Sequence, residues 1–124
     1  MDISKTYSKN NISTLNQVEL ESRALVRAAS MLNSIKEHWE TEKGNLSEVL
    51  EKNRLLWAVI ASAVSEDSCQ QPVEVRNNIA NLAVFVFQRT LALMMEPKPE
   101  GLDILININM NIAKGLAANE GKEE

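Results

Sequence analysis

The sequence predicts an all-α protein, a compact bundle of about four helices with a loose N-terminal arm and an acidic C-terminal tail. In four long segments, apolar residues recur in alternating steps of three and four, the period of an amphipathic helix. Stretches rich in Gly, Pro, Ser and Asn separate these segments. The one segment with an alternating, strand-like pattern has no second strand to pair with, and an unpaired strand is not stable by itself.

Length and composition indicate one small domain. The chain has 124 residues and a net charge of −4. We expect residues 1–16, which are polar, to form a loosely ordered arm, residues 17–118 to form a single helical domain, and residues 119–124 to form a disordered tail. The acidic balance makes direct nucleic-acid binding unfavourable, since such binding needs a basic surface.

The cysteine content and the apolar runs of the chain indicate where in the cell the protein is located. The single cysteine, Cys69, cannot form an internal disulfide, and the first residues are not apolar. Both observations favour a reducing cytoplasm. We expect no membrane span, because Asn81, Gln88 and Arg89 interrupt the longest apolar run, between Ile79 and Met95.

The first predicted helix covers about residues 18–41, and Gly44 is a plausible end. The second covers about residues 46–64, where Asn45 and Glu48 fit the N-cap and N3 positions of a capping box. Each has one apolar stripe. These stripes are Leu25, Ala28, Leu32, Ile35 and Trp39 in the first helix, and Val49, Leu56, Ile60 and Val64, flanked by Leu50 and Trp57, in the second.

The third predicted helix has Pro72 in its first turn and continues to about Met95. Its stripe is Val75, Ile79, Leu82, Val86 and Leu93. Since further apolar residues lie on both sides of this stripe, we expect this helix to be the central one. Residues 96–101, with two prolines and a glycine, then end it.

The last apolar segment, residues 102–116, fits two structures. Isoleucines and asparagines alternate in it, as in a half-buried strand. On a helical wheel the same residues give a wide apolar arc opposite Asp103, Asn107, Asn111 and Lys114. We favour the helix, because four helices bury their apolar faces without leaving an unpaired strand. That choice places Asn109 in the middle of the apolar arc.

No catalytic or metal site is evident. With one histidine and one cysteine the sequence lacks a zinc or iron ligand set, and it lacks phosphate-binding glycine motifs and the nucleophile elbow. We therefore expect no enzyme and no cofactor. The alternative is a histidine phosphotransfer-like bundle that uses His38, which would then lie on a helix of the bundle. Otherwise His38 is a surface residue beside Trp39.

Two buried amides are the main candidates for a site. Asn53, like Asn109, falls inside an apolar stripe. The two side chains either bond each other and fix helix register, or lie at a groove where a partner helix docks. We expect them to lie near each other, beside Trp57. Trp57 itself is either a core aromatic or an anchor of a binding surface.

Four further candidate residues, Glu21, Arg76, Phe85 and Phe87, are each open to two interpretations. Glu21 is either a solvated carboxylate near a helix N-terminus or the partner of Arg76 or Arg89 in an ion pair across the bundle. Phe85 and Phe87, like Ile104 and Met110, lie off the main stripes. Their excess apolar surface would face either a partner or a second copy of the chain.

Taken in order, these residues resemble those of the FlaF family of flagellar biosynthesis regulators, over roughly residues 18–116. The resemblance rests on the following elements: Glu21-x-x-Ala24-Leu25 and Trp39, Asn53-x-x-Leu56-Trp57, then Pro72, Arg76, Ile79, Leu82 and Ala83, and finally Leu105-Ile106-Asn107-Ile108-Asn109 with Ile112-Ala113-x-Gly115-Leu116. The departures are Asn107, Asn111 and the polar residues 1–16.

The resemblance implies a small cytoplasmic helical protein that is not an enzyme. It implies a flagellin chaperone and regulator that promotes flagellin synthesis and export and is associated with the partner regulator FlbT. The alternative outside this class is a self-associating structural module. The sequence leaves the oligomeric state open.

Overall fold

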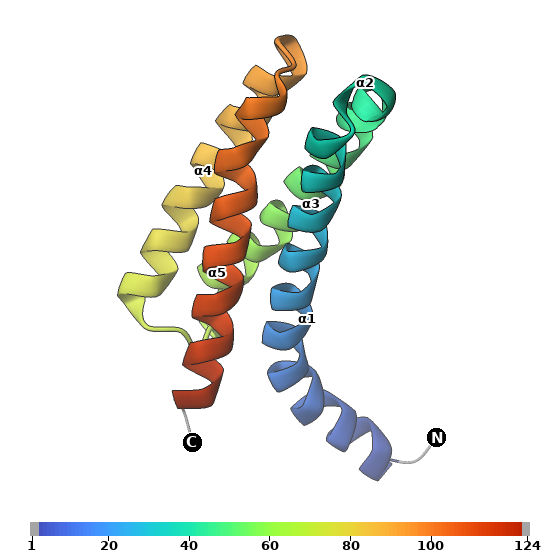
Figure 1. Ribbon diagram of the computed structural model, residues 1–124. Coiled ribbons are helices and arrows are strands. Elements are labelled where there is room, and N and C mark those ends of the chain that lie inside the picture. Colours follow the sequence, from blue (N-terminus) through green and yellow to red (C-terminus); the bar gives the residue numbers. More distant parts are fainter. Residues whose placement is uncertain (1–2, 123–124) are drawn as a thin grey trace.

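The computed structural model is all-α, as predicted (Figure 1). It describes the backbone of residues 3–122 and the side chains of residues 17–118. Its four long helices are α1 (Ile3–Glu37), α3 (Leu46–Ser65), α4 (Val73–Met95) and α5 (Asp103–Lys122). Three short elements, α2 (Trp39–Glu42), η1 (Lys43–Asn45) and η2 (Pro99–Leu102), complete it. Residues 3–122 contain no strand, so the strand considered for residues 102–116 is wrong and the helix is confirmed.

The predicted arm and tail concern the two ends of the chain. α1 begins at Ile3, so the described backbone of residues 3–16 continues the helix of the domain. Residues 1–2 and 123–124, and the side chains of residues 1–16 and 119–124, lie outside the described part. The boundaries at residues 16 and 118 therefore stay predictions.

α1 ends earlier than predicted, at Glu37 instead of about Thr41. His38 leaves the helical region, with φ −119° and ψ 44°, and becomes the N-cap of α2. Its carbonyl oxygen accepts hydrogen bonds from the backbone N–H groups of Thr41 and Glu42, at 3.1 and 2.8 Å. The helix therefore ends about two turns before Gly44, and α2 and η1 form the corner that leads to α3.

The cap of α3 is partly as predicted. Asn45 is its N-cap, but the Asn45 side chain makes no capping hydrogen bond. It donates instead to a Glu42 carboxylate oxygen at 2.7 Å. η1 runs directly into α3 and holds Asn45 in the helical region, where its side chain cannot turn back over the first N–H groups as an extended cap residue would.

The helices form a layered bundle in which α1 and α5 run antiparallel, α3 crosses behind them and α4 lies on the other side of α5 (Figure 1). α1 packs most extensively against α5, and α3 packs against both α4 and α1. The core is formed by apolar side chains from all four long helices around Trp57.

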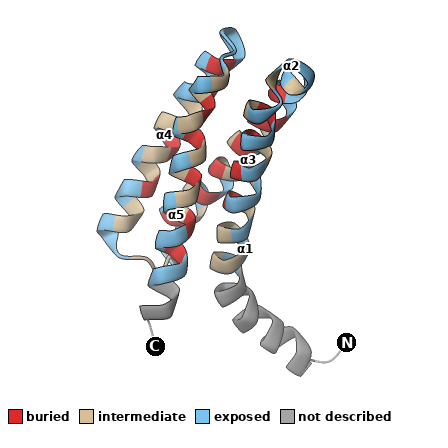
Figure 2. Ribbon diagram, viewed as in Figure 1, coloured by how far each residue is buried: buried red, intermediate tan, exposed pale blue. Residues whose placement is uncertain are grey.

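α4 is not the central helix, so that prediction is wrong. It packs mainly on α3 and much less on α5. Figure 2 shows more partly buried and exposed residues than buried ones along it. Of the apolar residues beside its main stripe, Leu91 and Met94 are thus exposed, whereas Phe85 and Phe87 are only partly buried. Pro72 is the N-cap of α4, one position before the predicted first turn.

α4 alone among the described helices is long and apolar enough to cross a membrane, by length and composition only. α4 passes this test despite Asn81, Gln88 and Arg89, and the expected absence of a membrane span stays a prediction. One such helix is weak evidence for a membrane, because the helix of a soluble core passes the same test.

Candidate functional site

Asn53 and Asn109 lie together in the centre of the bundle. Among residues 17–118, the buried polar residues are Asn53, Thr90 and Asn109, and both asparagines are 0% exposed. α3 supplies Asn53 from the middle of its buried stripe, and α5 supplies Asn109 between Leu105 and Ala113. The helical wheels of these two segments therefore predicted the inward positions of Asn53 and Asn109 correctly.

A directional chain of hydrogen bonds joins three helices. The indole N–H of Trp57 donates to Asn109 Oδ1 at 2.8 Å. Asn109 Nδ2 donates to Asn53 Oδ1 at 2.7 Å and to the backbone oxygen of Leu25 in α1 at 3.4 Å. The prediction that the two amides lie near each other, beside Trp57, is confirmed.

The chemistry of the indole sets the direction of this chain. An indole nitrogen can only donate, so the atom of Asn109 that faces Trp57 must be the amide oxygen. The amide nitrogen of Asn109 then faces Asn53, which must present its own oxygen. The nitrogen that remains at the end, Asn53 Nδ2, has no hydrogen-bond partner in the structure. These contacts fit a network that fixes the register of α1, α3 and α5, because each bond requires one residue to face another.

Two contacts join α1 to α5 on either side of this network, and neither is predicted from the sequence. The hydroxyl of Ser22 donates to the backbone oxygen of Ala113 at 3.0 Å. Near the other end, Lys36 Nζ lies 2.6 Å from Asp103 Oδ1. The carboxylate of Asp103 raises the pKa of Lys36 above its ordinary value. The sequence carries no signal for either pair, because the partners lie far apart along the chain.

Glu21 and Arg76 do not pair. Glu21 is half-buried in the middle of α1, where burial raises the pKa of its carboxyl and a hydrogen bond from Gln17 partly opposes that rise. Arg76 donates from Nε to the backbone oxygen of Val64 at 2.9 Å and from Nη2 to that of Glu66 at 3.4 Å. Arg76 thus caps the C-terminus of α3, whose last carbonyl groups lack helical partners. Both interpretations of Glu21 are therefore wrong: it lies in the middle of α1 and not near a helix N-terminus, and Arg76 bonds to the end of α3.

The two phenylalanines of α4 have different surroundings. Phe87 is partly buried against the core. Phe85 is also partly buried, and the guanidinium carbon of Arg89 lies 5.4 Å from the centre of its ring, within the range of a cation–π contact. Arg89 is therefore beside Phe85 on its own helix, not beside Glu21.

α4 also presents an apolar surface to solvent, which we call the α4 face. It consists of Val73, Val84, Leu91, Met94 and Met95. These are half of the exposed large apolar residues within residues 17–118. On a wheel of 100° per residue they fall within about one third of the helix circumference. Exposed apolar residues that share one side of a helix are typical of an interaction surface, whereas residues scattered singly are not.

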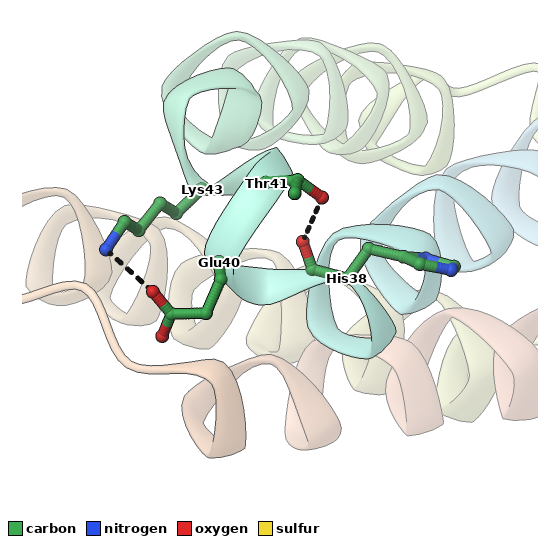
Figure 3. Close-up of polar contacts among 4 residues, drawn as sticks. All are labelled: His38, Glu40, Thr41 and Lys43. Carbon is green, nitrogen blue, oxygen red and sulfur yellow. Dashed lines mark hydrogen bonds and ion pairs between the residues drawn. The ribbon is translucent and has the colours of Figure 1, made fainter.

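His38 lies at the corner between α1 and α2 and not in the middle of a helix (Figure 3). It is exposed, and its Nδ1 lies 3.1 Å from the backbone oxygen of Ser34. Its neighbours are the Thr41 hydroxyl, which donates to the His38 carbonyl oxygen at 3.1 Å, and the ion pair of Lys43 with Glu40 at 3.4 Å. The helical position that a phosphotransfer histidine would need is therefore absent. The described residues also contain no group of three or more His, Cys, Asp or Glu that could hold a metal.

Comparison with known proteins supplies a family. The family model described as "Flagellar protein FlaF" matches residues 3–116, nearly the whole chain. No curated protein and no solved structure gives a significant match. The matched range includes the buried amide network and the α4 face. The chain therefore belongs to the FlaF family of flagellar proteins.

Proposed function

We propose that the chain is a cytoplasmic regulator of flagellar biosynthesis that binds flagellin as a chaperone and, together with FlbT, promotes flagellin synthesis and export. The observation that carries the proposal is the α4 face, an apolar surface that is exposed among the described residues 17–118. Membership of a flagellar family supports the choice of flagellin as the partner.

The geometry suits binding without chemistry. A chaperone of an exported protein has to cover an apolar helical surface of its substrate and then release it. A helix such as α4, with apolar residues along one exposed side, can pack against the apolar side of another helix. We infer that the chain is not an enzyme. We also infer that the amide network fixes the register of α3 and α5, the two helices against which α4 packs.

The test is calorimetry of the purified chain with flagellin, with and without FlbT. Leu91→Gln changes the α4 face, and Leu20→Gln on α1 is a matched control, because the two leucines are 61% and 62% exposed. We expect wild type and Leu20→Gln to bind alike. Leu91→Gln should bind at least about tenfold more weakly, the loss that corresponds to one well-packed interface side chain.

Two results would contradict the proposal. If the wild-type chain does not bind flagellin either with or without FlbT, the chaperone function is wrong. If Leu91→Gln and Leu20→Gln weaken binding equally, flagellin binds but not on the α4 face.

A further inference from the structure

α4 carries a second, largely apolar stripe that the fold leaves mostly exposed. Its positions alternate in steps of four and three, as the a and d positions of a coiled coil do. The stripe consists of Val73, Asn77, Ala80, Val84, Phe87, Leu91 and Met94. The stripe that packs into the core is a different set, which includes Ile79, Ala83, Val86 and Leu93.

This second stripe lies on the outer side of α4. Val73, Asn77, Val84, Leu91 and Met94 are exposed, and only Ala80 and Phe87 are partly buried. The stripe extends over almost the whole length of α4, about three heptads or roughly 33 Å. A regular seam of this length fits another helix that runs alongside it.

We propose that the occupant of this seam is the same stripe of a second copy of the chain, with the two α4 helices parallel and in register. Asn77 is the residue that selects this occupant. An asparagine in an otherwise apolar seam needs an amide opposite it, and it is known to fix register and a two-stranded state in parallel coiled coils. In a parallel, in-register pair, Asn77 of each copy meets Asn77 of the other, and every apolar residue likewise meets itself.

The charges on α4 permit this pairing although the whole chain is acidic. Glu74, Arg76 and Arg89 are the charged residues of α4, which gives one negative charge against two positive ones, a net charge of +1. Arg76 is already bonded to carbonyl groups at the end of α3. The side of the seam toward solvent carries the uncharged amides of Asn81 and Gln88. Two α4 helices can therefore approach without like charges facing each other in the seam.

The size of the seam predicts a weak dimer. A strip about 33 Å long and about 10 Å wide is smaller than the roughly 800 Å² per partner of a standard stable interface. The pair should therefore form and dissociate with concentration. The proposal does not rest on flagellin binding, but since it uses the α4 face, a copy that binds flagellin there would have to leave the dimer.

Sedimentation equilibrium of the chain alone, from about 10 µM to about 1 mM, tests the association. We expect the dimer fraction to rise across this range, Leu91→Gln to raise the dissociation constant at least about tenfold, and Leu20→Gln to leave it unchanged. A monomer at all concentrations, or a dimer that Leu91→Gln does not weaken, would overturn the proposal. Flagellin binding by a chain that stays monomeric would do so too, while leaving the proposed function intact.

Cross-linking tests the orientation. In a Cys69→Ser background, Leu91→Cys places the two thiols opposite each other only if the helices are parallel and in register, since an antiparallel pair brings position 91 near the other end of α4. We expect mild oxidation to give a covalent dimer with Leu91→Cys and not with the control Leu20→Cys. A dimer that Leu91→Cys fails to cross-link would refute the parallel arrangement.

Discussion

Replacing either buried asparagine by leucine should give very different losses of stability, although both residues are 0% exposed and both lie in apolar stripes. Asn109 makes three hydrogen bonds, with Trp57, Asn53 and the Leu25 carbonyl. Asn53 makes only one of them, and its amide nitrogen has no partner. We therefore expect Asn109→Leu to be much more destabilising than Asn53→Leu.

The size of the difference follows from counting the groups left without partners. Asn109→Leu leaves the Trp57 N–H and Asn53 Oδ1 without hydrogen-bond partners. Each buried group left in this way costs about 1–3 kcal/mol of stability, so the total loss is about 2–6 kcal/mol. Asn53→Leu leaves no group entirely without a partner, because Asn109 Nδ2 still donates to the Leu25 backbone oxygen. The same substitution also removes Asn53 Nδ2, which has no partner. The cost of fitting a leucine into an asparagine site is common to both variants. We expect the free energies of unfolding to differ by at least about 2 kcal/mol.

Urea denaturation followed by circular dichroism measures this difference. With a denaturant slope of about 1–3 kcal/mol per molar for a small domain, the midpoints should lie about 1 M urea apart. The double variant should be more stable than Asn109→Leu alone, since only the Trp57 N–H then lacks a partner. Asn109→Ala and Asn53→Ala repeat the comparison without excess volume. Equal losses, or a larger loss for Asn53→Leu, would refute the bonding direction described for the network.

Three other substitutions test local packing and charge. Gly115→Ala should stabilise the protein by about 0.5–1 kcal/mol, because Gly115 lies inside α5 with no atom within 4 Å of an added Cβ. Gly101→Ala should destabilise the protein by about 1–3 kcal/mol, because the added Cβ would lie 2.5 Å from Leu93 Cδ2. Thermal melts in which Gly101→Ala is more stable than Gly115→Ala would contradict this packing. The raised pKa of Glu21 means that the folded state favours the protonated carboxyl. Its contribution to stability is therefore complete below the ordinary value of 4.5 and is lost as pH rises through the folded pKa. Glu21→Gln should remove this loss in unfolding measured from pH 4 to 8, with exposed Glu48→Gln as control, and an unchanged pH profile would refute it.

Prediction from sequence succeeded where one helix alone determines the outcome. The inward positions of Asn53 and Asn109 follow from the wheel of each helix, because side chains three and four residues apart lie on one side. The end of α4 at the two prolines, and the N-cap position of Asn45, also depend on neighbouring residues only. The break at His38 was missed, because Gly44 is the stronger local signal and the corner is formed by backbone hydrogen bonds around His38.

By itself, the sequence determined the all-α class, the buried faces of the helices and the family, since these depend on periodicity and on residues in a fixed order. Only the tertiary structure decided what those faces meet. It gave Arg76 the carbonyl groups of α3 instead of Glu21, joined Ser22 and Lys36 to α5, and left α4 at the side of the bundle with an uncovered apolar face. The physical reason is that a wheel fixes the direction of a side chain about its own axis, whereas its partner depends on how the helices pack, which no single segment encodes.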